Sequence, residues 1–203
     1  MTRIKLCGLS RTCDIEAVNE LQPDYIGFVF APGSRRYVTP KQAEELKRLL
    51  SPEIKAVGVF VDEEPQTVAG LLKEGILDIA QLHGREEEDY IQQLRAQTTK
   101  PIIKAFRIDT FDSIADAEHS TADYVLLDSG NGGTGTVFNW ELAQKLKRPY
   151  FLAGGIRLEN VSDAIKTLRP FAVDISSGIE TGGYKDKRKM AAMVAAVRKE
   201  GRR

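Results

Sequence analysis

Strand-like and helix-like segments alternate eight times along this chain of 203 residues, and that repeat limits the possible folds more than any other feature. The strand-like segments are short apolar runs rich in β-branched residues, as buried parallel strands are. We expect strands at Ile4–Cys7, Tyr25–Phe30, Ala56–Val61, Ile79–Leu82, Ile102–Ala105, Tyr124–Leu127, Tyr150–Ala153 and Ala172–Ile175. Their ends recur every 21 to 31 residues, about the length of one β-loop-α-loop unit.

The segments between these runs carry helical patterns. Pro40 and Pro65 stand where the first turn of a helix tolerates proline, and Asn160 is expected to be the N-cap of a helix over Val161–Leu168. The C-terminal segment, Asp186–Lys199, should pack against the strands through an apolar stripe. That stripe consists of Met190, Met193, Val194 and Val197.

Eight such units with short connections predict parallel strands joined by right-handed crossovers. No linker rich in proline or serine divides the chain, so we expect one domain over residues 1–203. The predicted fold is a single (β/α)8 (TIM) barrel of the α/β class. A doubly wound open sheet is the alternative, because a repeat period alone does not prove that the sheet closes.

The charges balance, with 29 basic and 29 acidic residues, and this argues against nucleic acid or an anionic membrane as a partner. The N-terminus lacks an apolar signal segment, and no run reaches transmembrane length. The spacing of Cys7 and Cys13 fits neither a C-x-x-C motif nor a zinc site. We therefore expect a cytoplasmic protein with no metal. The sequence does not decide between a monomer and a homodimer.

The last two predicted strands end in small residues that suit an anion. Gly154 and Gly155 close one strand, and Ser177 and Gly178 follow the other. Backbone N–H groups at such turns can approach a phosphate closely. In barrels, the loops after strands 7 and 8 form this kind of site at the C-terminal face. The sequence thus predicts a phosphate site there and a phosphorylated small molecule as the ligand.

Two reactive side chains also fall at predicted strand ends. Cys7 ends the first strand, and Asp128 directly follows four apolar residues of the sixth. An aspartate in such surroundings could hold or deliver a proton. A cysteine that ends a buried strand is more often a small core residue, and Asp128 could equally be a cap of the next turn. His83, after the fourth strand, could act as an acid or base or could be a structural residue.

The glycines at 130, 132 and 135 satisfy the dinucleotide-binding pattern G-x-G-x-x-G. The pattern lies in the sixth strand–helix unit rather than the first, and no acidic residue stands at the end of the following strand. We therefore reject a dinucleotide and expect a glycine-rich lid over the pocket. Arg35 and Arg36 lie in a loop on the same face, where one of them could hold a carboxylate.

The chain resembles phosphoribosylanthranilate isomerase of tryptophan biosynthesis in several motifs that occur in the expected order. They are Lys5-Leu6-Cys7-Gly8, Gly27-Phe28-Val29-Phe30, Ser34-Arg35-Arg36-Tyr37-Val38, Val57-Gly58-Val59-Phe60-Val61, Gln81-Leu82-His83-Gly84, Leu127-Asp128 with Gly132-Gly133-Thr134-Gly135, and Val173-Asp174-Ile175-Ser176-Ser177-Gly178-Ile179-Glu180. The resemblance spans nearly the whole chain. It implies a (β/α)8 barrel without an organic cofactor or metal that catalyses an Amadori rearrangement of N-(5-phosphoribosyl)anthranilate.

The resemblance also implies roles for individual residues. Asp128 matches the family's acid, Cys7 its base, and Arg36 the arginine that faces the anthranilate. The phosphate site matches the turns at Gly154-Gly155 and Ser177-Gly178, and Asp174 is either a contact to a sugar hydroxyl or a structural residue.

Two alternatives remain at this point. The related isomerase of histidine biosynthesis would need two phosphate sites and two aspartates at opposing strand ends. Here the first strand ends in Cys7, and the first half of the chain has no second Gly-Gly turn. A barrel that only binds a phosphorylated metabolite would need neither Cys7 nor Asp128.

Overall fold

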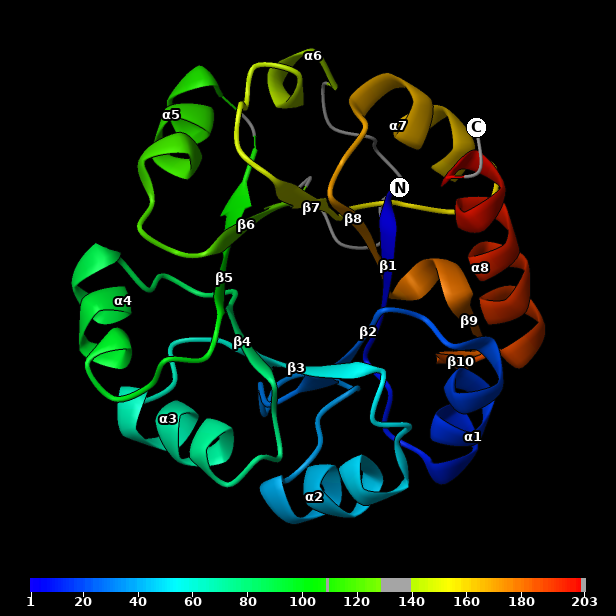
Figure 1. Cartoon of the computed structure of the whole chain (residues 1–203), viewed down its shortest axis with the longest axis horizontal. Coiled ribbons are helices and arrows are strands. Elements are labelled where there is room, and N and C mark those ends of the chain that lie inside the picture. The colour runs from blue at the N-terminus through cyan, green and yellow to red at the C-terminus, as the bar shows by residue number, and fades with distance from the viewer. Residues whose placement is uncertain (109, 129–139, 202–203) are drawn as a thin grey trace.

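The computed structural model describes residues 1–108, 110–128 and 140–201, and within them eight parallel strands close into a barrel in sequence order (Figure 1). The strands are β1 (Arg3–Cys7), β2 (Tyr25–Val29), β3 (Lys55–Phe60), β4 (Ile79–Leu82), β5 (Ile102–Arg107), β6 (Tyr124–Asp128), β7 (Tyr150–Leu152) and β8 (Ala172–Ile175). The ring closes where β8 pairs with β1, with Ile4 opposite Val173. All eight predicted strands are confirmed, and the doubly wound alternative is wrong.

Helices surround the barrel on the outside (Figure 1). They are α1 (Thr12–Leu21), α2 (Pro40–Leu49), α3 (Pro65–Lys73), α4 (Glu88–Arg95), α5 (Phe111–His119), α6 (Trp140–Ala143), α7 (Val161–Leu168) and α8 (Lys187–Gly201). Pro40 and Pro65 are the first residues of their helices, as predicted. Among the described helices, none combines the length and the apolar character that crossing a membrane requires.

Alternation along each strand divides the core into two layers. Side chains such as Ile4 and Leu6 point outward and pack under the helices, where α8 contributes its buried stripe of Met190, Met193 and Val194. The inward side chains fill the barrel itself. At its N-terminal end Phe151 packs against the rings of neighbouring aromatic residues. The barrel is thus plugged at that end, which leaves the C-terminal end for a site.

The sequence did not predict the structure of the segment after β8. After β8 the chain forms a short 3-10 turn, η1 (Ser177–Ile179), and then a small antiparallel hairpin of β9 (Glu180–Thr181) and β10 (Tyr184–Lys185). Its turn consists of Gly182 and Gly183. The hairpin buries the side chains of Glu180 and Lys185 beside the barrel mouth, and both contribute to the site described next.

Candidate active site

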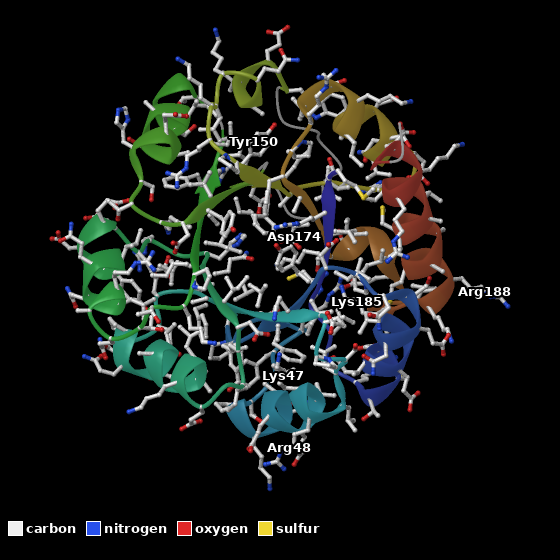
Figure 2. The ribbon with its side chains drawn as sticks, in the orientation of Figure 1. Lys47, Arg48, Tyr150, Asp174, Lys185 and Arg188 are labelled. Atoms are coloured by element: carbon white, nitrogen blue, oxygen red, sulfur yellow. The ribbon has the colours of Figure 1, made fainter. Side chains whose placement is uncertain are left out.

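A cavity of about 670 Å³ opens at the C-terminal end of the barrel. Seven of the eight predicted site residues line it: Cys7, Arg36, Asp128, Gly154, Gly155, Asp174 and Ser177. Because every strand runs in the same direction, residues far apart in sequence meet at this one rim. Figure 2 shows Asp174 inside the ring of strands, with Lys185 on the side of the hairpin. Gly178 lies instead in a neighbouring surface groove, where it packs against the carbonyl of Ile156.

Cys7 is the last residue of β1, and its side chain points into the barrel with little exposure. It pairs with Gly27 of β2, and the missing side chain of Gly27 makes room for the sulfur. Burial raises the pKa of the Cys7 thiol, while the ammonium groups of Lys5 and Lys185 act in the opposite direction. Burial outweighs the two ammonium groups, so the pKa of the thiol stays above its ordinary value.

The first of these cations, Lys5, is fully buried and lies two residues before Cys7 on the same face of β1. Its Nζ donates a hydrogen bond to Asp174 Oδ2 at 2.8 Å. Burial alone would lower the pKa of Lys5, but the interaction with Asp174, and to a lesser extent that with Cys7, outweighs it, so the pKa rises. The other oxygen, Asp174 Oδ1, is buried without a hydrogen-bond partner among the described residues.

The second cation belongs to a cluster around Glu180. Lys185 Nζ donates to Glu180 Oε1 at 2.7 Å and to the carbonyl of Ser176 at 2.9 Å. Arg36 and Arg35 donate to the same carboxylate. Burial would raise the pKa of Glu180, but the hydrogen bonds from Arg36 and Lys185 lower it to about 2. Glu180 thus stays ionised and anchors cations that reach it from the loop after β2 and from β10.

Asp128 ends β6 and faces the same cavity as Cys7. His83 Nε2 lies 3.2 Å from Asp128 Oδ2, and His83 Nδ1 lies 2.9 Å from Gln81 Nε2. An amide nitrogen can only donate, so His83 Nδ1 accepts and Nε2 carries the proton that points at Asp128. His83 therefore orients the carboxyl group of Asp128, which agrees with the structural alternative for this histidine.

The predicted phosphate turn after β7 contributes half-buried backbone to the cavity wall. Gly154 and Gly155 have φ angles of 79° and 66°, the left-handed region that glycine adopts readily. Asn160 holds this turn, because its side chain accepts from the N–H of Arg157 at 2.8 Å and donates to the carbonyl of Gly155 at 2.9 Å. Asn160 does occupy the N-cap position of α7, as predicted. Its side chain, however, makes no capping hydrogen bond to the helix.

Sequence reasoning missed Lys5, Glu180 and Lys185 as parts of the site. Lys5 could have been found, because the two-residue alternation of a strand places it on the same face as Cys7. The sequence around Glu180 and Lys185 contains no local pattern that predicts their burial, because that burial depends on the hairpin folding over the barrel rim. The glycines at 130, 132 and 135, and the lid proposed for them, lie outside the described residues.

Comparisons with known proteins agree with this geometry. The sequence profile of the family described as N-(5'phosphoribosyl)anthranilate (PRA) isomerase matches residues 4–196. The N-(5'-phosphoribosyl)anthranilate isomerase of Endomicrobium trichonymphae is 41% identical over 202 residues, which cover 98% of this chain and 99% of that protein.

Solved structures give the same result. The crystal structure of phosphoribosyl anthranilate isomerase from Thermus thermophilus is 35% identical, with a TM-score of 0.87 and coverage of 98% of this chain and 99% of that one. A phosphoribosyl anthranilate isomerase in complex with reduced 1-(o-carboxyphenylamino)-1-deoxyribulose 5-phosphate is 32% identical, with a TM-score of 0.85 and coverage of 98% and 100%. This chain belongs to the N-(5'-phosphoribosyl)anthranilate isomerase family.

Proposed function

We propose that this protein converts N-(5-phosphoribosyl)anthranilate into 1-(2-carboxyphenylamino)-1-deoxyribulose 5-phosphate by an Amadori rearrangement, a step of tryptophan biosynthesis. One observation on the residues of this chain supports the proposal. A thiol, Cys7, and a carboxyl group, Asp128, line one cavity from the ends of two different strands. The rearrangement needs an acid and a base on one substrate, and these two groups can supply them.

Asp128 is the acid in this proposal. It donates its proton to the ring oxygen of the ribose, the bond between that oxygen and C1′ breaks, and the nitrogen lone pair forms a C1′=N iminium. The hydrogen bond with His83 holds the carboxyl group toward the cavity. A group held in this way needs no reorientation when the bond breaks.

Cys7 is the base. Its thiolate removes the proton from C2′, an S–H bond forms, and the C–H electron pair becomes the C1′=C2′ bond of an enolamine. In the ketonisation that follows, C1′ takes a proton back from the thiol and the C2′ hydroxyl gives one to Asp128. Both groups return to their starting states, and the reaction needs no oxidant, reductant or cofactor.

The remaining residues bind the two ends of the substrate. The turn at Gly154-Gly155 and the N–H groups near Ser177 suit the phosphate, with Gly178 packing behind them. Arg36 suits the anthranilate carboxylate, because Glu180 uses only two of its five N–H donors. The unpartnered Asp174 Oδ1 suits a hydroxyl of the sugar, which would satisfy a buried acceptor.

The two alternatives receive less support. The histidine-pathway isomerase would place an aspartate where β1 ends, and here that position is Cys7. A barrel that only binds a phosphorylated metabolite does not account for an acid and a thiol in one cavity. Three expectations stay predictions: one domain over residues 1–203, a monomer or a homodimer, and a cytoplasmic location.

The test is a fluorescence assay of the purified protein with phosphoribosylanthranilate generated in situ, because this substrate is labile. We expect the fluorescence to fall far faster than by spontaneous hydrolysis, with formation of the aminoketose. The histidine-pathway substrate serves as the comparison. The proposal would be overturned if the protein consumed only the histidine-pathway substrate, or if it consumed neither substrate.

A further inference from the structure

The proposed reaction uses the ionised form of Cys7. A free thiol has a pKa of about 8.5, and only the thiolate is an effective base. The apolar surroundings of Cys7 oppose ionisation further. A fixed positive charge beside the sulfur would therefore make the thiolate easier to form.

Lys5 has the position and the charge to do this. It is on the inner face of β1, two residues from Cys7, and its side chain has no exposure to solvent. The hydrogen bond to Asp174 Oδ2 fixes the ammonium at one place in the barrel. Because its pKa is raised, Lys5 keeps its proton and cannot itself be the base. A permanent cation beside a thiol favours the thiolate.

Among the described residues, the other charged groups that face Cys7 are Asp174, Lys185 and Arg36. Asp174 repels a thiolate, whereas Lys185 and Arg36 attract one. Both of these cations bind Glu180 tightly, through hydrogen bonds of 2.7 Å from Lys185 and 2.6 Å from Arg36, so part of their charge is compensated. Lys5 is paired with a carboxylate as well, but it is the fully buried cation of the set and the one on the same strand as Cys7.

We propose that Lys5 is a positioning residue whose fixed ammonium favours the ionised form of Cys7 against the effect of burial, with Asp174 holding that ammonium in place. On ionisation the thiol proton leaves to water, and the sulfur keeps the electron pair that later takes the C2′ proton. This proposal depends on the proposed function in one respect, which is that the thiolate acts as the base in turnover. The ionisation itself is a property of the free protein and can be measured without substrate.

The experiment measures alkylation of Cys7 by iodoacetamide as a function of pH in the substrate-free protein. Cys13 is exposed and would react as well, so all variants carry Cys13→Ser. We expect Lys5→Met to raise the pKa of the Cys7 thiol by about one pH unit or more, which slows alkylation about tenfold below that pKa. Asp174→Asn removes the repelling charge and should lower the pKa. An unchanged pKa in Lys5→Met would overturn the proposal.

Lys5→Met alone leaves the Asp174 carboxylate buried without its partner, and that variant could fail to fold. The double variant Lys5→Met/Asp174→Asn removes both charges and avoids this problem. Its comparison with Asp174→Asn isolates the effect of Lys5. We expect a higher thiol pKa in the double variant, and equal values would refute the role of Lys5.

A matched control tests whether loss of any paired ammonium has the same effect. Lys47 on α2 binds Asp78 at 2.6 Å on the outside of the barrel, away from Asp174 (Figure 2). Lys47→Met should leave the alkylation profile of Cys7 unchanged, and a shift as large as that of Lys5→Met would refute a specific role of Lys5.

The outcome for Lys5 is independent of the outcome for Cys7 in turnover. Full activity of Cys7→Ser would end the proposed role of Cys7 as the base, whereas a shifted alkylation profile in Lys5→Met would still support the proposal for Lys5.

Discussion

Glu180 holds the guanidinium of Arg36 through two hydrogen bonds, from Nε at 2.6 Å and from Nη2 at 3.0 Å. This paired geometry is the strongest that arginine makes with a carboxylate, and it orients the plane of the guanidinium. Glu180 belongs to β9, while Arg36 belongs to the loop after β2, so the contact joins two distant segments at the barrel mouth. The arginine is thus already oriented before a carboxylate enters the cavity.

We expect Arg36→Ala to weaken binding of the anthranilate end of the substrate by about 10- to 100-fold, because it removes charge-assisted hydrogen bonds. Binding of phosphate should change little, since the phosphate turns lie at β7 and β8. Competition by the product and by inorganic phosphate separates the two effects. An equal loss of affinity for both competitors would contradict the assignment of Arg36.

The pKa of Glu180 predicts how this cluster responds to acid. The folded-state pKa, about 2, lies below the ordinary value of 4.5. The carboxylate therefore stabilises the fold above about pH 4.5, and that stabilisation is lost as the pH falls toward about 2. The free energy of unfolding of wild type should exceed that of Glu180→Gln by ~3 kcal/mol at neutral pH, with the difference shrinking in acid.

The control for this experiment is Glu44→Gln. Glu44 forms an exposed pair with Arg48 on α2, and such pairs contribute little to stability. A pH-independent difference between wild type and Glu180→Gln, or an equal effect of Glu44→Gln, would show that the buried cluster does not stabilise the fold in this way.

Gly178 should be needed for packing behind the phosphate turns. A Cβ at this position would lie 2.3 Å from the carbonyl oxygen of Ile156, so the backbone would have to move. We expect Gly178→Ala to lower the free energy of unfolding by about 1–3 kcal/mol and to weaken phosphate binding. Gly33→Ala is the control, because a Cβ there meets no atom within 4 Å. Equal stability of the two variants in urea unfolding would refute this expectation.

Gly27 should matter for turnover more than for stability. A Cβ at this position would lie 2.6 Å from the sulfur of Cys7, and the thiol side chain would have to move away. Because small displacements of a reacting group are costly, we expect kcat to fall about 10- to 100-fold in Gly27→Ala.

Thermal unfolding of Gly27→Ala should show a much smaller change. Gly70→Ala on α3, where a Cβ meets no atom within 4 Å outside its own helix, should leave kcat unchanged and raise the unfolding temperature slightly. A kcat for Gly27→Ala equal to that of wild type would contradict the position assigned to the sulfur.

Much of the fold followed from the sequence because each strand is a local apolar run. The residues at strand ends, Cys7 and Asp128, could be placed at the same rim for the same reason. The environment of these residues could not be predicted. Lysine in a strand is usually exposed, and the burial of Lys5 depends on Asp174, which is 169 residues away and meets it only when the barrel closes.

The hairpin illustrates the same limit. Its strands are two residues each, too short to give a period, and its turn of Gly182 and Gly183 suggests only a loop. Glu180 and Lys185 are charged residues whose ordinary place is the surface. Their burial follows from contacts with Arg36 and with the backbone of Ser176, which no local sequence pattern contains.

The most direct test of the account is the kcat for phosphoribosylanthranilate of the single variants Cys7→Ser and Asp128→Asn, measured alongside circular dichroism to show that each barrel is folded. The account predicts that each variant loses most of its turnover while it keeps its fold. Turnover equal to that of wild type in either folded variant would contradict it.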